Sequence, residues 1–329
     1  MIPIPPFTRG GHWLLTSAAA KVDLTKRMRH ALNATGLRLY AADITPMSAA
    51  FAFADDHLQL PRLDADEFLD VLIDACNRRH IRVILPTRDA DLKFLSTHAA
   101  PLTAAGIWPL VSPLDTIDCC LDKIRFHDHC IAHGLPVLPR LEHPAAADFP
   151  CFIRPRCGAG STGSGPVASP ALFQALHGTG TDLLVQPLCK DPEYSIDALF
   201  SPEGNAMQWV VRERLRIRAG ESVVSRTVAI PAFDTVIQTL AASLPFCGPV
   251  TIQAFYSKSQ GVRLIEVNPR FGGASALGIE AGLDTPARLV ALAQGDNERF
   301  LYNRSLRMGL TMLRYAADVF IDMPTEPAP

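Results

Sequence analysis

Three oxygen-bearing side chains fall at spacings that bring them together on two neighbouring strands. Glu266 and Asn268 occupy alternate positions of "RLIEVNP", so both side chains, with that of Leu264, point to one face of the expected strand. The segment "SKSQGVRL" predicts a hairpin whose four-residue connection, 258–261, puts Gln253 opposite Glu266. Opposed residues have Cβ atoms about 5 Å apart. Such hard oxygen donors suit Mg²⁺ bound to a nucleotide's phosphates, and a solvated polar edge strand is the alternative.

A loop rich in glycine and small hydroxyl residues follows another expected strand. In "RPRCGAGSTGSGP", residues 154–166, backbone N–H groups can approach a phosphate because no side chain blocks the way. The loop lacks the G-x-x-x-x-G-K-[ST] pattern of a P-loop. Arg154 and Arg156 at its root favour a phosphate cover over a flexible linker. With the helix expected over 170–177, the segment 150–187 is small enough to be a mobile lid.

Arginines dominate the segment "RERLRIRAGESVVSRTV", residues 212–228. Strand alternation predicts that four of them share one face: Arg212, Arg214, Arg216 and Arg218. Like charges in a row repel one another unless anions lie nearby. We therefore expect an anionic acceptor such as a carboxylate, with Arg216, Arg218 and Arg226 as its contacts; a solvated charged face is the alternative.

Two helical positions carry weaker signals. Lys123 in "DKIRF" comes early in an expected helix, where its amine could reach an anion, although most such lysines are merely solvated. His129 and His133 are spaced i, i+4 beside Cys130. Without the glutamate of an H-E-x-x-H motif, two ligands on one face do not predict a zinc site.

The whole-chain composition limits the class of protein. The 329 residues are 48% apolar with a mean hydropathy of +0.14, which predicts two or three domains with a substantial core. The balance of 31 Lys plus Arg against 33 Asp plus Glu argues for neither nucleic acid nor a membrane as partner. No apolar run could span a bilayer, and the start lacks a signal peptide, so we expect a cytoplasmic protein. The eight cysteines contain no C-x-x-C pair, which favours reduced thiols.

The order of expected elements predicts a parallel sheet followed by antiparallel strands. Strands and helices alternate at the start, over 12–18, 22–35, 38–43, 65–80, 81–87 and 108–112, which is typical of a parallel sheet with helical crossovers. The loop "TSAAAKVD" has no glycine, so a dinucleotide site is excluded there. Two helical pieces follow over 112–139, and from 188 onward the strands are joined by short turns. We expect three parts: an N-terminal α/β domain, linker helices with a lid, and a catalytic subdomain, over 1–112, 113–187 and 188–329.

Five segments occur in an order that resembles the ATP-grasp superfamily and, within it, proteins similar to the carbamoyl-phosphate synthetase large chain. They are "LDK" at 121–123, "FIRPRCGAGSTGS" at 152–164, "LLVQPLCKDPEYSID" at 183–197, "VTIQAF" at 250–255 and "LIEVNPRFGG" at 264–273. The resemblance covers nearly the whole chain. It implies an α/β (α+β) protein, in which a Rossmann-like parallel-sheet domain precedes an ATP-grasp fold with a small lid and a larger antiparallel subdomain.

The resemblance also implies roles for individual residues. Gln253, Glu266 and Asn268 would hold Mg²⁺, or Mn²⁺, and a glutamine where many relatives have an acid implies weaker metal binding. Arg270, with Arg216 and Arg218, would stabilise the transferring phosphoryl group. Further ATP contacts would come from Lys123, Arg154, Gly158, Gly160, Ser161, the hinge residues Gln186, Pro187 and Leu188, and Glu193 at the ribose. Substrate would be bound by Arg216, Arg218, Arg226, Gly272 and Gly273.

The implied reaction is ATP-dependent ligation. A small-molecule carboxylate would be phosphorylated to an acyl phosphate and joined to an amine, with release of ADP and phosphate. A carbamoyl-phosphate-synthetase-like phosphotransferase that stops at the phosphorylated product is the first alternative, and an ATP-binding regulatory module without turnover is the second. A homodimer is left open.

Overall fold

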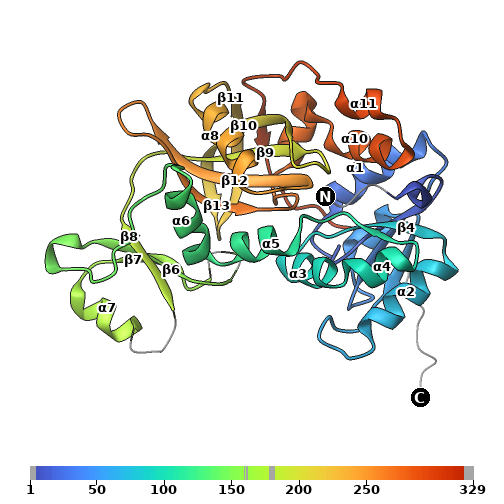
Figure 1. Cartoon of the computed structure of the whole chain (residues 1–329), viewed down its shortest axis with the longest axis horizontal. Helices are drawn as coiled ribbons and strands as arrows, with labels where there is room; N and C mark the ends of the chain where they lie inside the picture. Colours follow the sequence, from blue (N-terminus) through green and yellow to red (C-terminus); the bar gives the residue numbers. More distant parts are fainter. Residues whose placement is uncertain (1–4, 159, 161, 178–181, 322–329) are drawn as a thin grey trace.

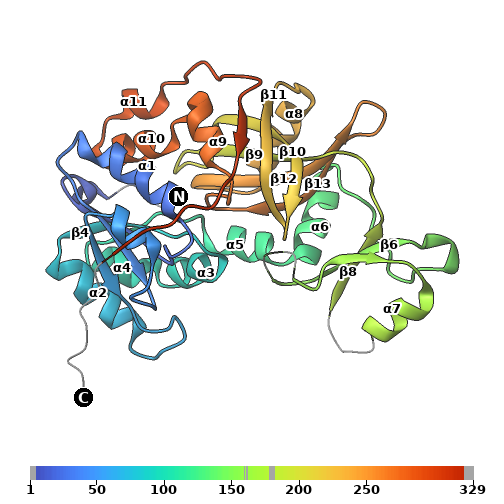
Figure 2. The ribbon, with the colours of Figure 1, turned by 180° about the vertical axis from the view of Figure 1, so that it is seen from behind.

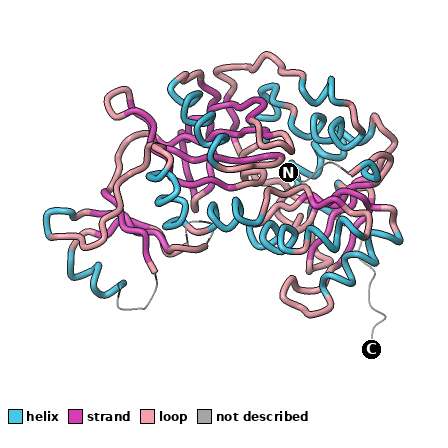
Figure 3. The backbone as a smooth tube through the Cα atoms, viewed as in Figure 1, coloured by secondary structure: helices cyan, strands magenta, loops and turns pink. Residues whose placement is uncertain are grey.

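The computed structural model describes residues 5–158, 160, 162–177 and 182–321, arranged around three β-sheets (Figure 1). Figure 3 shows the strands gathered in three places, with helices around each group. No helix of the described residues is long and apolar enough to cross a membrane. The mixed α/β fold that the sequence predicts is confirmed.

The first sheet is parallel and belongs to the N-terminal part of the chain. Its strand order is β3-β2-β1-β4-β5, so the order reverses between β1 and β4. The strands are β1 (His12–Leu15), β2 (Leu39–Asp43), β3 (Asp56–Gln59), β4 (Ile81–Leu85) and β5 (Trp108–Pro109). The helices are α1 (Val22–Asn33), α2 (Phe68–Arg78), α3 (Asp89–Thr97) and α4 (Ala99–Ala104). The parallel sheet was expected, whereas β3 was not.

Apolar side chains fix this sheet between two helical layers. Met28 and Leu32 of α1 share a core cluster with Leu289 of α10 (Thr285–Gln294) on one face. Leu72 of α2 and Leu92 of α3 belong to the cluster on the other face. Since α10 comes from the C-terminal part of the chain, one continuous core joins the two parts.

A small sheet forms the lid. Two linker helices, α5 (Leu114–Leu121) and α6 (Lys123–Ala132), lead to it. Its strands have the order β7-β6-β8 and are β6 (Cys151–Pro155), β7 (Gly165–Val167) and β8 (Leu183–Pro187), with α7 (Pro170–His177) beside them. The lid projects to one side of the molecule in Figure 1 and has a small core of its own.

The large sheet is antiparallel, with strand order β13-β12-β9-β10-β11-β14. Its strands are β9 (Glu193–Phe200), β10 (Ala206–Arg218), β11 (Glu221–Val228), β12 (Gly248–Ser257), β13 (Gly261–Asn268) and β14 (Thr311–Leu313). One face packs on α6 and α8 (Ala232–Ser243), where Phe126, Phe233 and Ile252 share a core. Figure 2 shows the chain after β14 running from this sheet along the N-terminal domain. The C-terminal part also contains α9 (Ala276–Gly278), the π-helix η4 (Ile279–Leu283) and α11 (Asn297–Leu301).

The hairpin between β12 and β13 has a shorter turn than the sequence predicts. Ser257 pairs with Gly261, which leaves a three-residue connection, 258–260. Gly261 has φ +70°, a left-handed conformation that favours glycine at the end of such a turn. The expectation of a four-residue connection was therefore wrong.

A bulge compensates for the missing turn residue. Ala254 pairs with Leu264 but Gln253 pairs with Glu266, so Ile265 is the extra residue in β13. Gln253 and Glu266 thus face each other, as expected. The bulge also reverses the alternation, so Leu264 lies in the hydrophobic core and does not share a face with Glu266 as predicted.

Candidate functional site

The polar face of the large sheet brings the three expected oxygen donors into contact. Gln253 Nε2 donates a hydrogen bond of 3.0 Å to Glu266 Oε1, and Asn268 Nδ2 donates one of 3.2 Å to the same oxygen. All three side chains are partly buried. Within the described residues, no group of three or more His, Cys, Asp and Glu could hold a metal ion. A cation here would therefore depend on amide and phosphate oxygens as well as on the one carboxylate.

Each of these three residues also accepts a hydrogen bond from an arginine. Arg214 donates to Gln253 Oε1 at 3.0 Å, Arg154 to Glu266 Oε2 at 3.3 Å, and Arg270 to Asn268 Oδ1 at 3.2 Å. Each arginine also has a carboxylate partner: Arg154 pairs with Glu266 itself, Arg214 with Glu193 and Arg270 with Asp89. The site thus gathers three guanidinium groups, whose planar forks can bind phosphate as they bind carboxylate.

Arg154 on the small sheet binds residues of the large sheet. It is only 7% exposed, and burial lowers its pKa although the nearby Glu266 carboxylate raises it. Its other hydrogen bonds go to Gln186 Oε1 at 3.3 Å and to the Ile265 carbonyl at 2.9 Å. Gln186 in turn donates to the Leu138 carbonyl at 3.1 Å. The hinge therefore begins at a fixed, buried position.

Other expected nucleotide contacts lie between β8 and β9. Pro187 ends β8, and Leu188 follows it, partly buried. Glu193 begins β9 and forms an ion pair with Arg214. Burial raises the pKa of Glu193, while Arg214 acts to lower it. The Glu193 carboxylate is thus paired with an arginine. The family resemblance implies that it would also contact the ribose.

The glycine-rich loop is held at its root by α6. Asp122 caps this helix by accepting hydrogen bonds from the backbone N–H groups of the next turn, and it binds Arg156 at 2.7 Å. Lys123 Nζ donates to the Gly158 carbonyl at 2.9 Å, and burial lowers the lysine pKa. Gly158 and Gly160 have φ of +129° and +67°, which favour glycine. Ser161 lies outside the described residues.

Cys157 beside this loop provides a probe of nucleotide binding. Cys157 is exposed and Cys189 partly exposed, whereas the other six thiols are buried, and burial raises the pKa of Cys76 and Cys247 to about 12. We expect a thiol reagent to label Cys157 first at pH 8 and MgATP to slow this labelling several-fold. Peptide mass spectrometry would show it; equal labelling with and without MgATP would contradict a role of the loop in covering the nucleotide.

Arg270 connects the sheet to the N-terminal domain through a residue that sequence reasoning missed. Its Nε donates to Asp89, the first residue of α3. Asp89 belongs to no recognisable motif, because an acidic residue in the first turn of a helix is common for its electrostatic effect alone. Only the packing of the two domains brings it to Arg270.

The prediction that the arginine-rich segment presents one continuous charged face is wrong. Register shifts on β10 between Arg214 and Ile217 interrupt the alternation. Arg212 is 1% exposed and paired with Asp197, whereas Arg216 and Arg218 are exposed near the end of the β10–β11 hairpin.

Arg226 lies apart from the other proposed substrate contacts. It pairs in register with Glu213, whose carboxylate it binds at 2.7 Å. Glu213 alternates with Arg212 and Arg214, so this pair faces the opposite side of the sheet. The structure therefore does not bring Arg226 to Glu266. The two glycines after Arg270 do lie beside the site: Gly272 N donates to Ser275 Oγ, and the Gly273 carbonyl is bound by Arg314.

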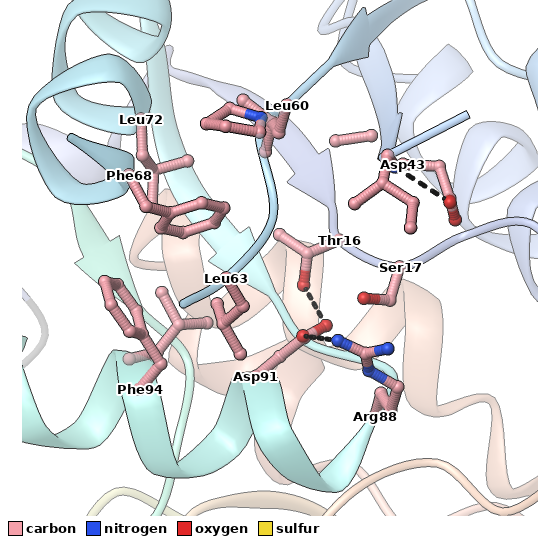
Figure 4. A pocket seen from close by; sticks show the side chains of 14 residues that line it. Thr16, Ser17, Asp43, Leu60, Leu63, Phe68, Leu72, Arg88, Asp91 and Phe94 are labelled. Atoms are coloured by element: carbon pink, nitrogen blue, oxygen red, sulfur yellow. Dashed lines mark hydrogen bonds and ion pairs between the residues drawn. The ribbon is translucent and has the colours of Figure 1, made fainter. Parts of the chain in front are cut away.

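A separate pocket opens at the carboxyl ends of β1 and β2 in the N-terminal domain (Figure 4). It contains about 410 Å³ of space outside atoms, part of which is open to solvent. Phe68, Leu72 and Phe94 form its apolar wall. On the polar side Thr16 donates to Asp91 at 2.9 Å. The position matches the crevice in which open α/β sheets bind ligands, and no motif in the sequence marks it.

Comparison with known proteins finds family models that match two parts of the chain. Residues 13–110 match the model of the PylC-like N-terminal domain, and residues 179–312 match that of the ATP-grasp domain in the biosynthetic pathway with Ter operon. The carbamoyl phosphate synthase large chain of Thermomicrobium roseum is 25% identical over 269 residues, which are 73% of this chain and 24% of the synthase. The chain thus spans about a quarter of the length of that relative.

Solved structures share the fold at low sequence identity. The biotin carboxylase domain of the 2-oxoglutarate carboxylase from Hydrogenobacter thermophilus, in complex with MgADP, has a TM-score of 0.73 and 16% identity over 91% of this chain and 73% of that one. An N5-carboxyaminoimidazole ribonucleotide synthetase in complex with ADP has a TM-score of 0.72 and 14% identity, covering 92% and 80%. An L-amino acid ligase from Bacillus licheniformis has a TM-score of 0.68 and 17% identity, covering 90% and 78%. These structures share the fold of nearly the whole chain, and residues 179–312 match an ATP-grasp domain, so the chain is similar to ATP-grasp proteins in both fold and sequence.

Proposed function

We propose that the protein phosphorylates a small carboxylate with ATP and joins the resulting acyl phosphate to an amine. The observation that carries the proposal is the convergence of Arg154, Arg214 and Arg270 on the oxygens around Glu266. This arrangement offers both a cation ligand and donors for phosphate in one place. The L-amino acid ligase and synthetase neighbours support the choice of a ligase.

Three residues would hold Mg²⁺ together with phosphate oxygens: Gln253, Glu266 and Asn268. Their donor chemistry fits a hard cation, and Mn²⁺ accepts the same oxygen ligands. Bound there, the ion would neutralise charge on the phosphates during transfer. The arginines that now bind these oxygens would turn to the phosphates, since a guanidinium pairs well with phosphate in a bidentate geometry.

In the proposed reaction a carboxylate oxygen attacks the γ-phosphorus and ADP leaves. The amine nitrogen then attacks the acyl carbon, loses a proton and displaces phosphate. The guanidinium of Arg270 binds both Asn268 and Asp89. From this position it can bind negative charge that develops on the transferring phosphoryl group. The lid would exclude water and protect the acyl phosphate from hydrolysis.

The direct test is ADP release with purified protein, MgATP and paired panels of small carboxylates and amines. Release that requires both an acid and an amine supports the proposal. Release that needs the acid but no amine would favour the phosphotransferase, and binding of ATP with no ADP from any pair would favour a regulatory module. We include a homodimer in the proposal by analogy with the carboxylase domain dimer. Sedimentation of the purified protein would test it.

The Arg270→Lys variant tests the proposed role of this side chain in phosphoryl transfer. Lysine keeps one charge but cannot bind Asn268 and the transferring group through a planar fork. We expect kcat to fall about 100-fold, the size typical for loss of one aligned charge-stabilising donor. Arg29, an exposed residue of α1 that pairs with Asp55, provides the control, and Arg29→Lys should keep wild-type kcat. Unchanged kcat in Arg270→Lys would remove Arg270 from the mechanism.

A further inference from the structure

The pocket of Figure 4 lies where the strand order of the parallel sheet reverses, between β1 and β4. Thr16 and Ser17 directly follow β1, and Arg88 comes between β4 and α3. Open α/β sheets bind ligands at such points, in the crevice beyond the carboxyl ends of the strands. The proposed phosphoryl transfer uses none of the residues that line this pocket. The chemistry of its walls therefore points to a ligand of its own.

Asp91 provides a buried carboxylate whose hydrogen bonds are incomplete. The residue is only 4% exposed. Its Oδ2 accepts from Thr16 at 2.9 Å, and its Oδ1 has a contact of 3.5 Å with Arg88, at the outer limit of a hydrogen bond. A carboxylate can accept about four hydrogen bonds, and no other donor of the described residues binds this one. Since a buried charge is costly without such bonds, the unused positions favour a ligand that brings N–H donors.

The rim beside Asp91 is held in an unusual backbone conformation. Ser17 has φ +50°, in the left-handed region that few residues other than glycine adopt. Thr87 Oγ1 fixes this turn through a shared hydrogen bond to the carbonyls of Thr16 and Ser17, at 3.0 and 2.9 Å. The Ser17 hydroxyl lines the pocket and makes no hydrogen bond within the described part of the chain. Backbone strain of this kind is common where a ligand is held.

The opposite wall and the mouth of the pocket indicate the chemical class of the ligand. Figure 4 shows Phe68, Leu72 and Phe94 across the pocket from Ser17 and Arg88, where they form an apolar wall. The Arg88 side chain is 56% exposed, so its guanidinium is free to turn to a carboxylate that enters from solvent. A buried anion, an exposed cation and an apolar wall together are complementary to a zwitterion with an apolar body.

We propose that this pocket binds an α-amino acid with an apolar side chain. The ammonium group of the ligand donates to Asp91 and Ser17, and its carboxylate pairs with Arg88. Its side chain packs against Phe68 and Phe94. Binding of this kind requires neither ATP nor turnover, so the inference goes beyond the proposed ligase function and does not depend on it.

The start of α3 separates this pocket from the proposed phosphoryl-transfer centre. Asp89 binds Arg270, and Asp91, two residues further along the helix, lines the pocket. Residues two apart on a helix do not face the same way. The amino acid is therefore a ligand held apart from the reacting groups.

Calorimetric titration of the whole protein without ATP tests the proposal. The probes are valine, leucine, methionine and phenylalanine, each in its L and D forms. We expect saturable binding of at least one of them at a single site. Glycine, which lacks the apolar side chain, should bind about 10- to 100-fold more weakly, as for loss of one buried apolar side chain. No saturable binding of any of these amino acids would overturn the inference.

Two variants separate the ammonium contact from the carboxylate contact. If leucine binds, Arg88→Gln should weaken its binding about tenfold, as for loss of one hydrogen bond between charged groups. The same variant should bind isopentylamine, which is leucine without its carboxylate, as the wild type does. Asp91→Asn should weaken both ligands at least about tenfold. Arg78→Gln is the matched control, because Arg78 is an exposed arginine of α2 that does not line the pocket.

The remaining outcomes are decided by the exposed arginine and by the reaction centre. Circular dichroism would show whether Asp91→Asn folds; if it does not, Arg88→Gln decides alone, and equal affinity for the amino acid in Arg88→Gln and Arg78→Gln contradicts the site. Glu266→Gln should bind the amino acid as the wild type does. Binding that is lost in Glu266→Gln but kept in Arg88→Gln would place the ligand at the reaction centre and overturn the inference. Failure of every acid and amine pair to release ADP would contradict the proposed function and leave this pocket unaffected.

Discussion

Glu266→Gln is expected to reduce kcat by about 1000-fold while the protein stays folded. The glutamine oxygen can still accept from Gln253 and Asn268, but an amide NH2 replaces the oxygen that accepts from Arg154, and the side chain brings no negative charge to the cation site. Without the only carboxylate among the three oxygen donors, a divalent cation loses its strongest protein ligand. The expected loss follows from the several kcal/mol that a metal ion contributes to charge stabilisation in a transition state. Steady-state ADP release measures it, with circular dichroism to confirm the fold.

Glu298→Gln is the control for this variant because Glu298 is exposed and belongs to α11, outside the three sheets. Its kcat should equal that of the wild type. Raising the Mg²⁺ concentration should recover part of the activity of Glu266→Gln if weak cation binding is the cause. Full activity in Glu266→Gln at ordinary Mg²⁺ would contradict the site as described.

Asp197→Ala is expected to lower the free energy of unfolding by about 3–5 kcal/mol, the usual effect of breaking a buried pair. Arg212 is 1% exposed and Asp197 4% exposed, and two hydrogen bonds of 2.6 and 2.8 Å join them. Asp197 also accepts from Ser275 Oγ at 3.1 Å. Removing the carboxylate leaves a buried guanidinium without a counterion, which explains the size of the effect. Urea unfolding would measure it.

Asp74→Ala gives the matched comparison, since Asp74 and Arg78 form the same kind of pair on the surface of α2. Exposed pairs contribute about 0–1 kcal/mol because water and salt screen them. Equal, small losses in both variants would show that the Asp197–Arg212 pair does not stabilise the large sheet.

The pairing of Gln253 with Glu266 is predicted correctly although the turn is not, because the turn is one residue shorter and β13 contains one extra residue. A four-residue turn without a bulge and a three-residue turn with a bulge at Ile265 give the same pairing of Gln253 with Glu266. Alternation alone cannot distinguish them, and the position of Leu264 shows which one forms. Periodicity thus predicts which residues meet but not how the backbone achieves it.

The arginine-rich strand shows where local patterns fail. Five arginines of similar appearance, from Arg212 to Arg226, have different environments because each depends on a distant carboxylate or on a register shift. Asp89 could not be found at all, since it reaches Arg270 only when the N-terminal domain packs against the large sheet. Sequence patterns within one element carry no information on such contacts.

The formation of an acyl phosphate is the central claim, and transfer of ¹⁸O tests it most directly. The acid found in the ADP-release screen would be labelled with ¹⁸O in its carboxylate and incubated with protein, MgATP and the amine. If a carboxylate oxygen attacks the γ-phosphorus, that oxygen leaves with the phosphate when the amine displaces it. We predict released phosphate that contains one ¹⁸O atom, by mass spectrometry. Unlabelled phosphate released together with the ligated product would contradict the account.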